Sequence, residues 1–190
     1  GQHHTRAGAR LAFGTYAQTH YRLEQAAVIL ALDTEPLTWG TGSLRYIREL
    51  ARGRALDEKR SEMNRLYAVE STPSSVGAVA DHRLNIPPSA MGPFARALAS
   101  RLGIGSSSTL SGDWGNWLDA LAGDLQKYRG RSVVIAGESQ PPAVHALAHA
   151  LNATLGNVGR TVVYTEPAEA EPVDEIASLR ELAADMDGGR

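Results

Sequence analysis

The stretch that decides the fold covers residues 131–165 and reads RSVVIAGESQPPAVHALAHALNATLGNVGRTVVYT. It opens with residues 132–136, a Val- and Ile-rich run typical of a strand that is buried on both faces. Pro141 and Pro142 indicate where a helix begins, because the first helical turn leaves the N–H that proline lacks unpaired anyway. A second apolar run follows at residues 161–164. Strand, helix and strand at these lengths predict a parallel βαβ crossover, and therefore an α/β domain.

The rest of the chain alternates in the same way. Residues 26–32 and 65–69 predict two more buried strands, and residues 83–86 a short extended one. Helices are predicted from Ser43, from Ser89, over residues 113–127 and from Pro172. This alternation favours a doubly wound, Rossmann-like, mostly parallel sheet of about five strands with helices on both faces. In that order, residues 26–32 and 132–136 should be adjacent central strands. Residues 1–20 carry few signals, so we assign the domain to residues 21–190 and leave 1–20 as a poorly defined N-terminal segment.

Composition narrows the functional classes. The 190 residues suit one domain, and a net charge of −2 gives no electrostatic footprint for nucleic acid. The sequence has no cysteine, which excludes disulfides, thiolate metal sites and iron–sulfur clusters within this segment. No apolar run is long enough for direct membrane insertion. Because the chain lacks a starting Met and stops just after a predicted helix, we expect a fragment of a longer polypeptide.

Two sets of residues are candidates for chemistry. His145 and His149 lie four apart on one helix face, which is the spacing of a metal-ligand pair. No third ligand accompanies them, so we interpret them as polar surface positions and predict no metal site. Several carboxylates follow predicted strands, where α/β sheets bind ligands. Turn formation and capping explain them more simply, so spacing alone indicates an α/β domain with a candidate ligand crevice.

Three segments carry a resemblance to a known family. They are MNRLYAVESTPSSVGAVADHRL (63–84), VVIAGESQPPAVHALAHALNATLGNVGRTVVYTEP (133–167) and ASLRELAADMDGG (177–189). They resemble the molybdopterin-oxidoreductase-like part of the large iron–sulfur subunit of alternative complex III, a bacterial quinol-oxidising respiratory complex. The resemblance implies a domain similar to the dimethyl sulfoxide reductase superfamily that holds no molybdenum cofactor. It also implies iron–sulfur clusters in a separate ferredoxin-like region of the parent chain, and partner subunits at the periplasmic face of the inner membrane.

Comparison with true molybdenum enzymes indicates an eroded cofactor site. Their first strand leads into a Gly-x-Asn turn, where this chain has Asp33-Thr34-Glu35, and their second strand ends in Asp-Pro-Arg, where this chain has Glu70-Ser71-Thr72. The Ala80-Asp81 pair and the turn at residues 155–159 are retained. We therefore expect a vestigial cofactor crevice formed by Asp33, Glu70, Ser71, Thr72, Asp81, Gly137 and Glu138.

The leading hypothesis is a non-catalytic, cofactor-free structural and interaction domain of an iron–sulfur subunit in a respiratory quinol:electron-acceptor oxidoreductase. The parent chain would belong to an oxidoreductase, and this segment would contribute no catalytic residue. The alternative is a fragment that binds molybdopterin guanine dinucleotide, and a third hypothesis is a generic ligand-binding module. We expect Asp33, Glu35, Glu70 and Glu138 around the mouth of the crevice, where their negative charge would repel a pyrophosphate.

Overall fold

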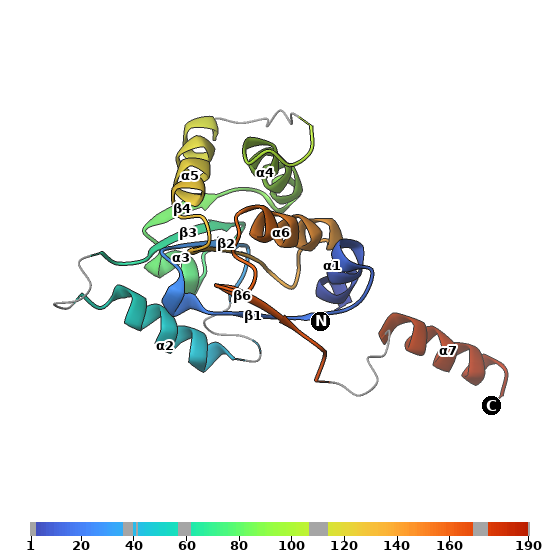
Figure 1. The fold of residues 1–190 in the computed structure, drawn as a ribbon. Coiled ribbons are helices and arrows are strands. Elements are labelled where there is room, and N and C mark those ends of the chain that lie inside the picture. Colours follow the sequence, from blue (N-terminus) through green and yellow to red (C-terminus); the bar gives the residue numbers. More distant parts are fainter. Residues whose placement is uncertain are drawn as a thin grey trace.

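The computed structural model describes residues 3–35, 40, 42–56, 62–106, 114–168 and 175–189 (Figure 1). Its elements are, in chain order, α1 (His3–Phe13), β1 (Gln18–Tyr21), the 3₁₀ helix η1 (Leu23–Gln25), β2 (Val28–Leu32), α2 (Ser43–Arg54), β3 (Arg65–Glu70), α3 (Ser75–Val79), β4 (His82–Asn85), α4 (Pro88–Arg101), α5 (Gly115–Lys127), β5 (Ser132–Ala136), α6 (Pro142–Thr154), β6 (Val162–Thr165) and α7 (Glu175–Asp187). Asp113 and Pro172, where helices were expected to begin, lie outside the described residues. The chain is a mixed α/β protein.

A four-stranded parallel sheet, in the order β4-β3-β2-β5, forms the centre of the fold. The predicted neighbours β2 and β5 pair in parallel, from Val28 opposite Ser132 to Leu32 opposite Ala136. All five residues of β2 are buried, as expected for a strand with neighbours on both edges and helices over both faces. Of these two strands only β2 is internal, because β5 is an edge strand of the sheet, so the expectation that both are central was wrong for β5.

The core has two layers because successive side chains of a strand point to opposite faces. Val28, Leu30 and Leu32 pack with α4, α5 and α6, whereas Ile29 and Ala31 pack with α2 and α3. Figure 1 shows α4, α5 and α6 on one side of the sheet and α2 and α3 on the other. Removing each such Val, Leu or Ile side chain from water contributes about 1.5–3 kcal/mol, which makes this alternation the main source of stability.

The second half of the predicted βαβ unit was wrong. β6 does not join the parallel sheet but pairs antiparallel with β1, from Gln18 opposite Thr165 to Tyr21 opposite Val162. Along β6 only Val162 is fully buried, unlike the strands of the central sheet. Its partner β1 has no strand signal in the sequence, because its four residues are half-buried and mostly polar.

Side chains occupy the edge of β5 where another strand was expected. The amide of Asn152 accepts a hydrogen bond from Val134 N at 3.0 Å and donates one to Val134 O at 2.8 Å. At Ser132, the backbone N–H donates to Asn157 Oδ1 at 3.4 Å, and the carbonyl accepts from the Thr161 hydroxyl. These polar side chains are almost fully buried. They satisfy backbone groups that a neighbouring strand would otherwise satisfy, so the sheet ends at β5.

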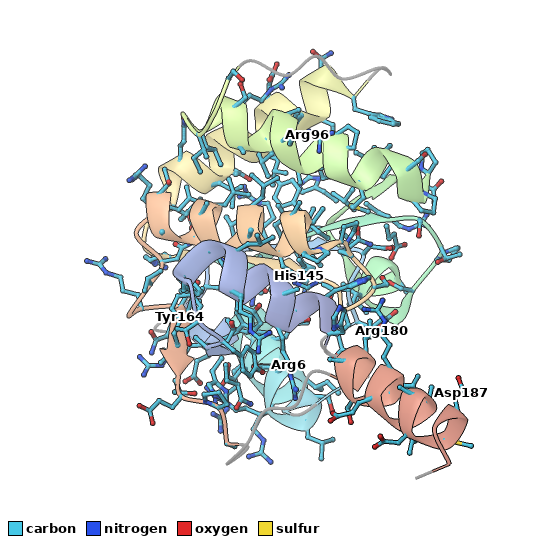
Figure 2. The ribbon with its side chains drawn as sticks, turned by 90° about the vertical axis from the view of Figure 1, so that its right-hand side faces the viewer. Arg6, Arg96, His145, Tyr164, Arg180 and Asp187 are labelled. Carbon is cyan, nitrogen blue, oxygen red and sulfur yellow. The ribbon has the colours of Figure 1, made fainter. Side chains whose placement is uncertain are left out.

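Residues 1–20, for which no element was predicted, contain α1 and most of β1. α1 packs alongside α6 (Figure 2). The two helices approach closely at Gly8, where any Cβ would overlap the Cβ of His145. Buried Ala9 sits beside this contact. Small residues therefore create the contact, and small residues give little hydrophobic signal in a sequence.

α7 extends away from the rest of the chain in both views (Figures 1 and 2). Every described side chain of this helix is exposed or half-exposed. Among the described residues, no helix combines the length and the apolar character that crossing a membrane requires.

Candidate functional site

A pocket of about 480 Å³ opens at the carboxyl ends of β2 and β5. The turns after these strands contribute carboxylates, and the segment around β1 together with α2 contributes aromatic rings. The side chains that define its character are Asp33, Glu35, Glu138, Tyr16, Tyr21 and Tyr46. Of the described residues that line the pocket, none is a lysine or an arginine. The pocket is therefore a negatively charged, tyrosine-rich hollow at the position where α/β sheets bind their ligands.

Asp33 follows β2 and joins three strand ends. Its backbone has a φ of 48°, a left-handed conformation that Asp tolerates better than most residues other than glycine. One carboxylate oxygen accepts hydrogen bonds from both the N–H and the hydroxyl of Ser71, each at 3.0 Å. The other accepts from Gln140 Nε2 at 2.8 Å. The Asp33 carboxylate therefore links the ends of β2 and β3 to the turn after β5.

Glu70 ends β3, but its side chain turns beneath α3 and does not line the pocket. The residue is 3% exposed, and its carboxylate accepts hydrogen bonds from Arg83 Nε and the Ser74 hydroxyl. Gly77 of α3 lies directly on this carboxylate, so a Cβ at that position would overlap it. The buried carboxylate of Glu70 needs the charge of Arg83, because removing one member of a buried ion pair costs about 3–5 kcal/mol. The expectation that Glu70 lies at the mouth of the crevice was wrong.

Three backbone amides at the end of β3 and the start of α3 already have acceptors within the chain. Ser71 N donates to Asp33, Ser75 N donates to Glu35 Oε1 at 2.9 Å, and Gly77 N donates to the Ser74 hydroxyl at 2.9 Å. In nucleotide-binding α/β proteins, amides at equivalent turns and helix starts face phosphate. Here carboxylates and a serine take the place of the phosphate oxygens.

The turn after β5 is also filled by contacts within the chain. Gly137 N donates to Leu32 O at 2.9 Å, and a Cβ on Gly137 would overlap the carbonyl oxygen of Asp33, so the two turns touch and require glycine here. α6 then begins after Pro141 with Pro142 in its first turn, and neither proline has an N–H to offer an anion. Glu138 is exposed at the rim of the pocket, and Thr72 is exposed after β3.

Asp81 belongs to the opposite end of the sheet, which corrects its assignment to the crevice. Its carboxylate accepts from Leu66 N at 2.8 Å, near the start of β3, and from both terminal nitrogens of Arg54 at 2.9 and 2.7 Å. Partial burial alone would raise the pKa of Asp81, but these hydrogen bonds outweigh it and hold the pKa below its usual value. Asp81 precedes β4 instead of following β3, so it anchors the amino ends of the strands.

The tyrosines of the pocket have structural contacts of their own. Tyr46 Oη accepts from Tyr21 N at 3.3 Å, and the two rings lie 6.0 Å apart. Burial raises the pKa of both Tyr21 and Tyr46, so both phenols are neutral near pH 7. Arg6 of α1 lies 5.3 Å from the centre of the Tyr16 ring. These rings shape the pocket without adding charge.

His145 and His149 are not surface positions, as the sequence suggested, but are 4% and 7% exposed beneath α1. Figure 2 places His145 between α1 and α6. Burial lowers the pKa of each to about 4, so both rings are neutral at pH 7. His149 Nδ1 lies 3.0 Å from the hydroxyl of Tyr164, whereas the Nε2 atoms of both histidines are buried without a hydrogen-bond partner. The described part of the chain contains no group of three or more His, Cys, Asp or Glu side chains suited to a metal ion.

Sequence reasoning missed the partners that determine how the site works. Gln140, Arg83 and Ser74 complete the hydrogen bonds of the strand-end carboxylates, and each lies in a turn or an edge strand with no pattern of its own. Only Gln140 had a signal, as a polar residue just before the prolines that begin α6.

No protein-family model matches this chain, and no curated protein matches it.

Proposed function

We propose that this chain is a non-catalytic, cofactor-free structural and interaction domain, with the doubly wound, Rossmann-like ancestry of the molybdopterin oxidoreductases. Its setting would be an iron–sulfur subunit of a respiratory quinol:electron-acceptor oxidoreductase at the periplasmic face of the bacterial inner membrane. The clusters would lie in another region of the parent chain. Its partners would be that ferredoxin-like region and the other subunits of the complex.

The observation that carries this proposal is that backbone amides at the crevice are already hydrogen-bonded to side chains of the chain itself. The amides of Ser71 and Ser75 donate to the chain's own carboxylates, Asp33 and Glu35. A pyrophosphate would have to displace two carboxylates that are already hydrogen-bonded, and it would meet no described Lys or Arg in the pocket in exchange. Two like charges 4 Å apart repel by about 4 kcal/mol at a protein surface. The residues present do not fit a pterin dinucleotide.

One observation favours the alternative, a domain that binds molybdopterin guanine dinucleotide. The pocket of about 480 Å³ lies at the carboxyl ends of the strands, where such a cofactor would bind. The cofactor contains phosphate and holds molybdenum, so the two proposals differ in elemental composition.

The test is elemental analysis of the complete gene product, purified with its natural partners. We expect iron and acid-labile sulfide from clusters outside this segment, and only traces of molybdenum and of protein-bound organic phosphate. Stoichiometric molybdenum with two phosphates would establish the alternative. A complete gene product without iron–sulfur clusters, or without partner subunits, would contradict the proposed setting.

A further inference from the structure

α7 presents an apolar stripe to solvent along its whole length. Leu179 is 66% exposed and Met186 is 70% exposed, and Ile176 and Leu182 complete the stripe at three- and four-residue steps. Such spacing puts side chains on one helix face. A helix with this stripe is normally held against another apolar surface, yet no described side chain of α7 is fully buried.

α2 has a second solvent-facing stripe, on the side of the helix away from the sheet. Leu44 is 82% exposed and Ile47 is 44% exposed, and exposed Ala51 continues the same face. The opposite face packs into the core through Tyr46 and Leu50. α2 is therefore apolar on both sides, although one side suffices to hold it on the sheet.

The two helices carry opposite net charge. α2 carries four arginines and one glutamate; Arg48 lies beside its exposed stripe, whereas Arg52 already pairs with Glu24, 3.5 Å away. α7 carries Glu181, Asp185 and Asp187 against Arg180 in the part whose side chains are described. Figure 2 shows Arg180 and Asp187 on this outlying helix. The helices also match in length, since 12 and 13 residues span about 18 and 20 Å.

We propose that α7 of one copy of this chain packs against α2 of a second copy, and that the same contact is made in return. Figure 1 shows α2 and α7 on opposite sides of the same chain. A two-fold arrangement would cover both apolar stripes of both copies at once, because each copy contributes one α2 and one α7. The basic α2, with Arg48 beside its stripe, would pack on the acidic α7 of the partner copy, so the pairing would follow the charges of the two helices and be sensitive to salt. This interface does not depend on the proposed function.

Sedimentation equilibrium of the chain at increasing concentration tests the proposal. The unchanged chain should form a dimer that weakens as the salt concentration rises. Ile47→Asp on α2 and Leu179→Asp on α7 should each abolish the dimer, because every contact then has a carboxylate in its apolar stripe. Leu11→Asp on α1 is the matched control, since Leu11 is 67% exposed and belongs to neither stripe, and the dimer should persist. Circular dichroism should show the same helix content for all three variants.

Mixing the two dimer-breaking variants separates this arrangement from its rivals. In a mixed pair, the unaltered α7 of the Ile47→Asp chain can pack on the unaltered α2 of the Leu179→Asp chain. One of the two contacts is then intact, and heterodimers should form in an equimolar mixture although neither variant dimerises alone. A mixture that stays monomeric would overturn the proposal, as would an unchanged chain that is monomeric at every concentration, or a dimer that survives Leu179→Asp.

Discussion

Replacing Asn152 with alanine should destabilise the chain, because it removes the hydrogen bonds that pair the outer edge of β5. The amide of Asn152 forms three buried hydrogen bonds, two with the backbone of Val134 at 3.0 and 2.8 Å and one with Asn157 Nδ2 at 3.0 Å. Alanine leaves the N–H and C=O of Val134 and a donor of Asn157 unpaired. Val134 and Asn157 are both 0% exposed, so water does not reach these groups without a rearrangement.

The expected cost follows from those three groups. A buried polar group that loses its partner costs about 1–3 kcal/mol. Alanine gains roughly 0.5 kcal/mol of helix propensity over asparagine. Three such groups cost about 3–9 kcal/mol together, so the free energy of unfolding should fall by at least about 2.5 kcal/mol. With an m-value of about 2 kcal/mol/M, the urea midpoint should move down by at least about 1 M.

The matched control is Asn116→Ala, which makes the same change at an exposed position of α5. It should leave the free energy of unfolding unchanged or raise it by less than about 0.7 kcal/mol, because only helix propensity changes. Urea unfolding followed by circular dichroism measures both variants. Equal midpoints for Asn152→Ala and Asn116→Ala would refute the reasoning, since the edge of β5 would then be satisfied in some other way.

Two further predictions concern the contact between α1 and α6. The pKa of His145 and of His149 is about 4 in the folded chain, below the unfolded value of 6.5, so the unfolded chain takes up protons that the folded chain cannot. Stability should therefore fall as the pH drops from 6.5 towards 4, by up to about 3 kcal/mol for each histidine. His145→Leu should reduce this fall relative to the unchanged chain, and urea titrations at pH 7 and pH 4.5 that show equal falls would contradict the burial of His145. Gly8→Ala should destabilise the chain despite better helix propensity, because its Cβ overlaps His145, whereas Gly123→Ala in α5, where nothing lies within 4 Å, should stabilise it by about 1 kcal/mol. Thermal unfolding compares the two alanine variants, and equal melting temperatures would exclude the close approach of the helices.

Burial on both faces made three of the four parallel strands readable from the sequence. β2, β3 and β5 are continuous apolar runs, and their pairing order follows from the alternation with helices. The antiparallel pair of β1 and β6 could not be read in the same way. The reason that β6 does not pair with β5 lies in Asn152, a polar residue within an apolar helix, whose contact with Val134 appears only once the helix is folded onto the strand.

The position of the candidate site could be predicted from the sequence, but the hydrogen-bond partners of its carboxylates could not. Asp33 and Gly137 follow strands and do lie at the carboxyl edge of the sheet. Whether a strand-end carboxylate faces a ligand or its own chain depends on donors that are distant in sequence, such as Gln140 for Asp33. Asp81 was misplaced because it lies 11 residues after the end of β3, and only the short β4 shows which end of the sheet it reaches.

The most direct test of the central claim is calorimetric titration of the chain with guanosine diphosphate at low salt, where electrostatic attraction is least screened. The claim is that Asp33 and Glu35 occupy the amides that a nucleotide would need. The unchanged chain should therefore show no saturable heat at millimolar nucleotide, and Asp33→Ala, which releases Ser71 N, should bind no more weakly than the unchanged chain. Micromolar binding by the unchanged chain that Asp33→Ala weakens would show that the crevice is a working nucleotide site and that the account is wrong.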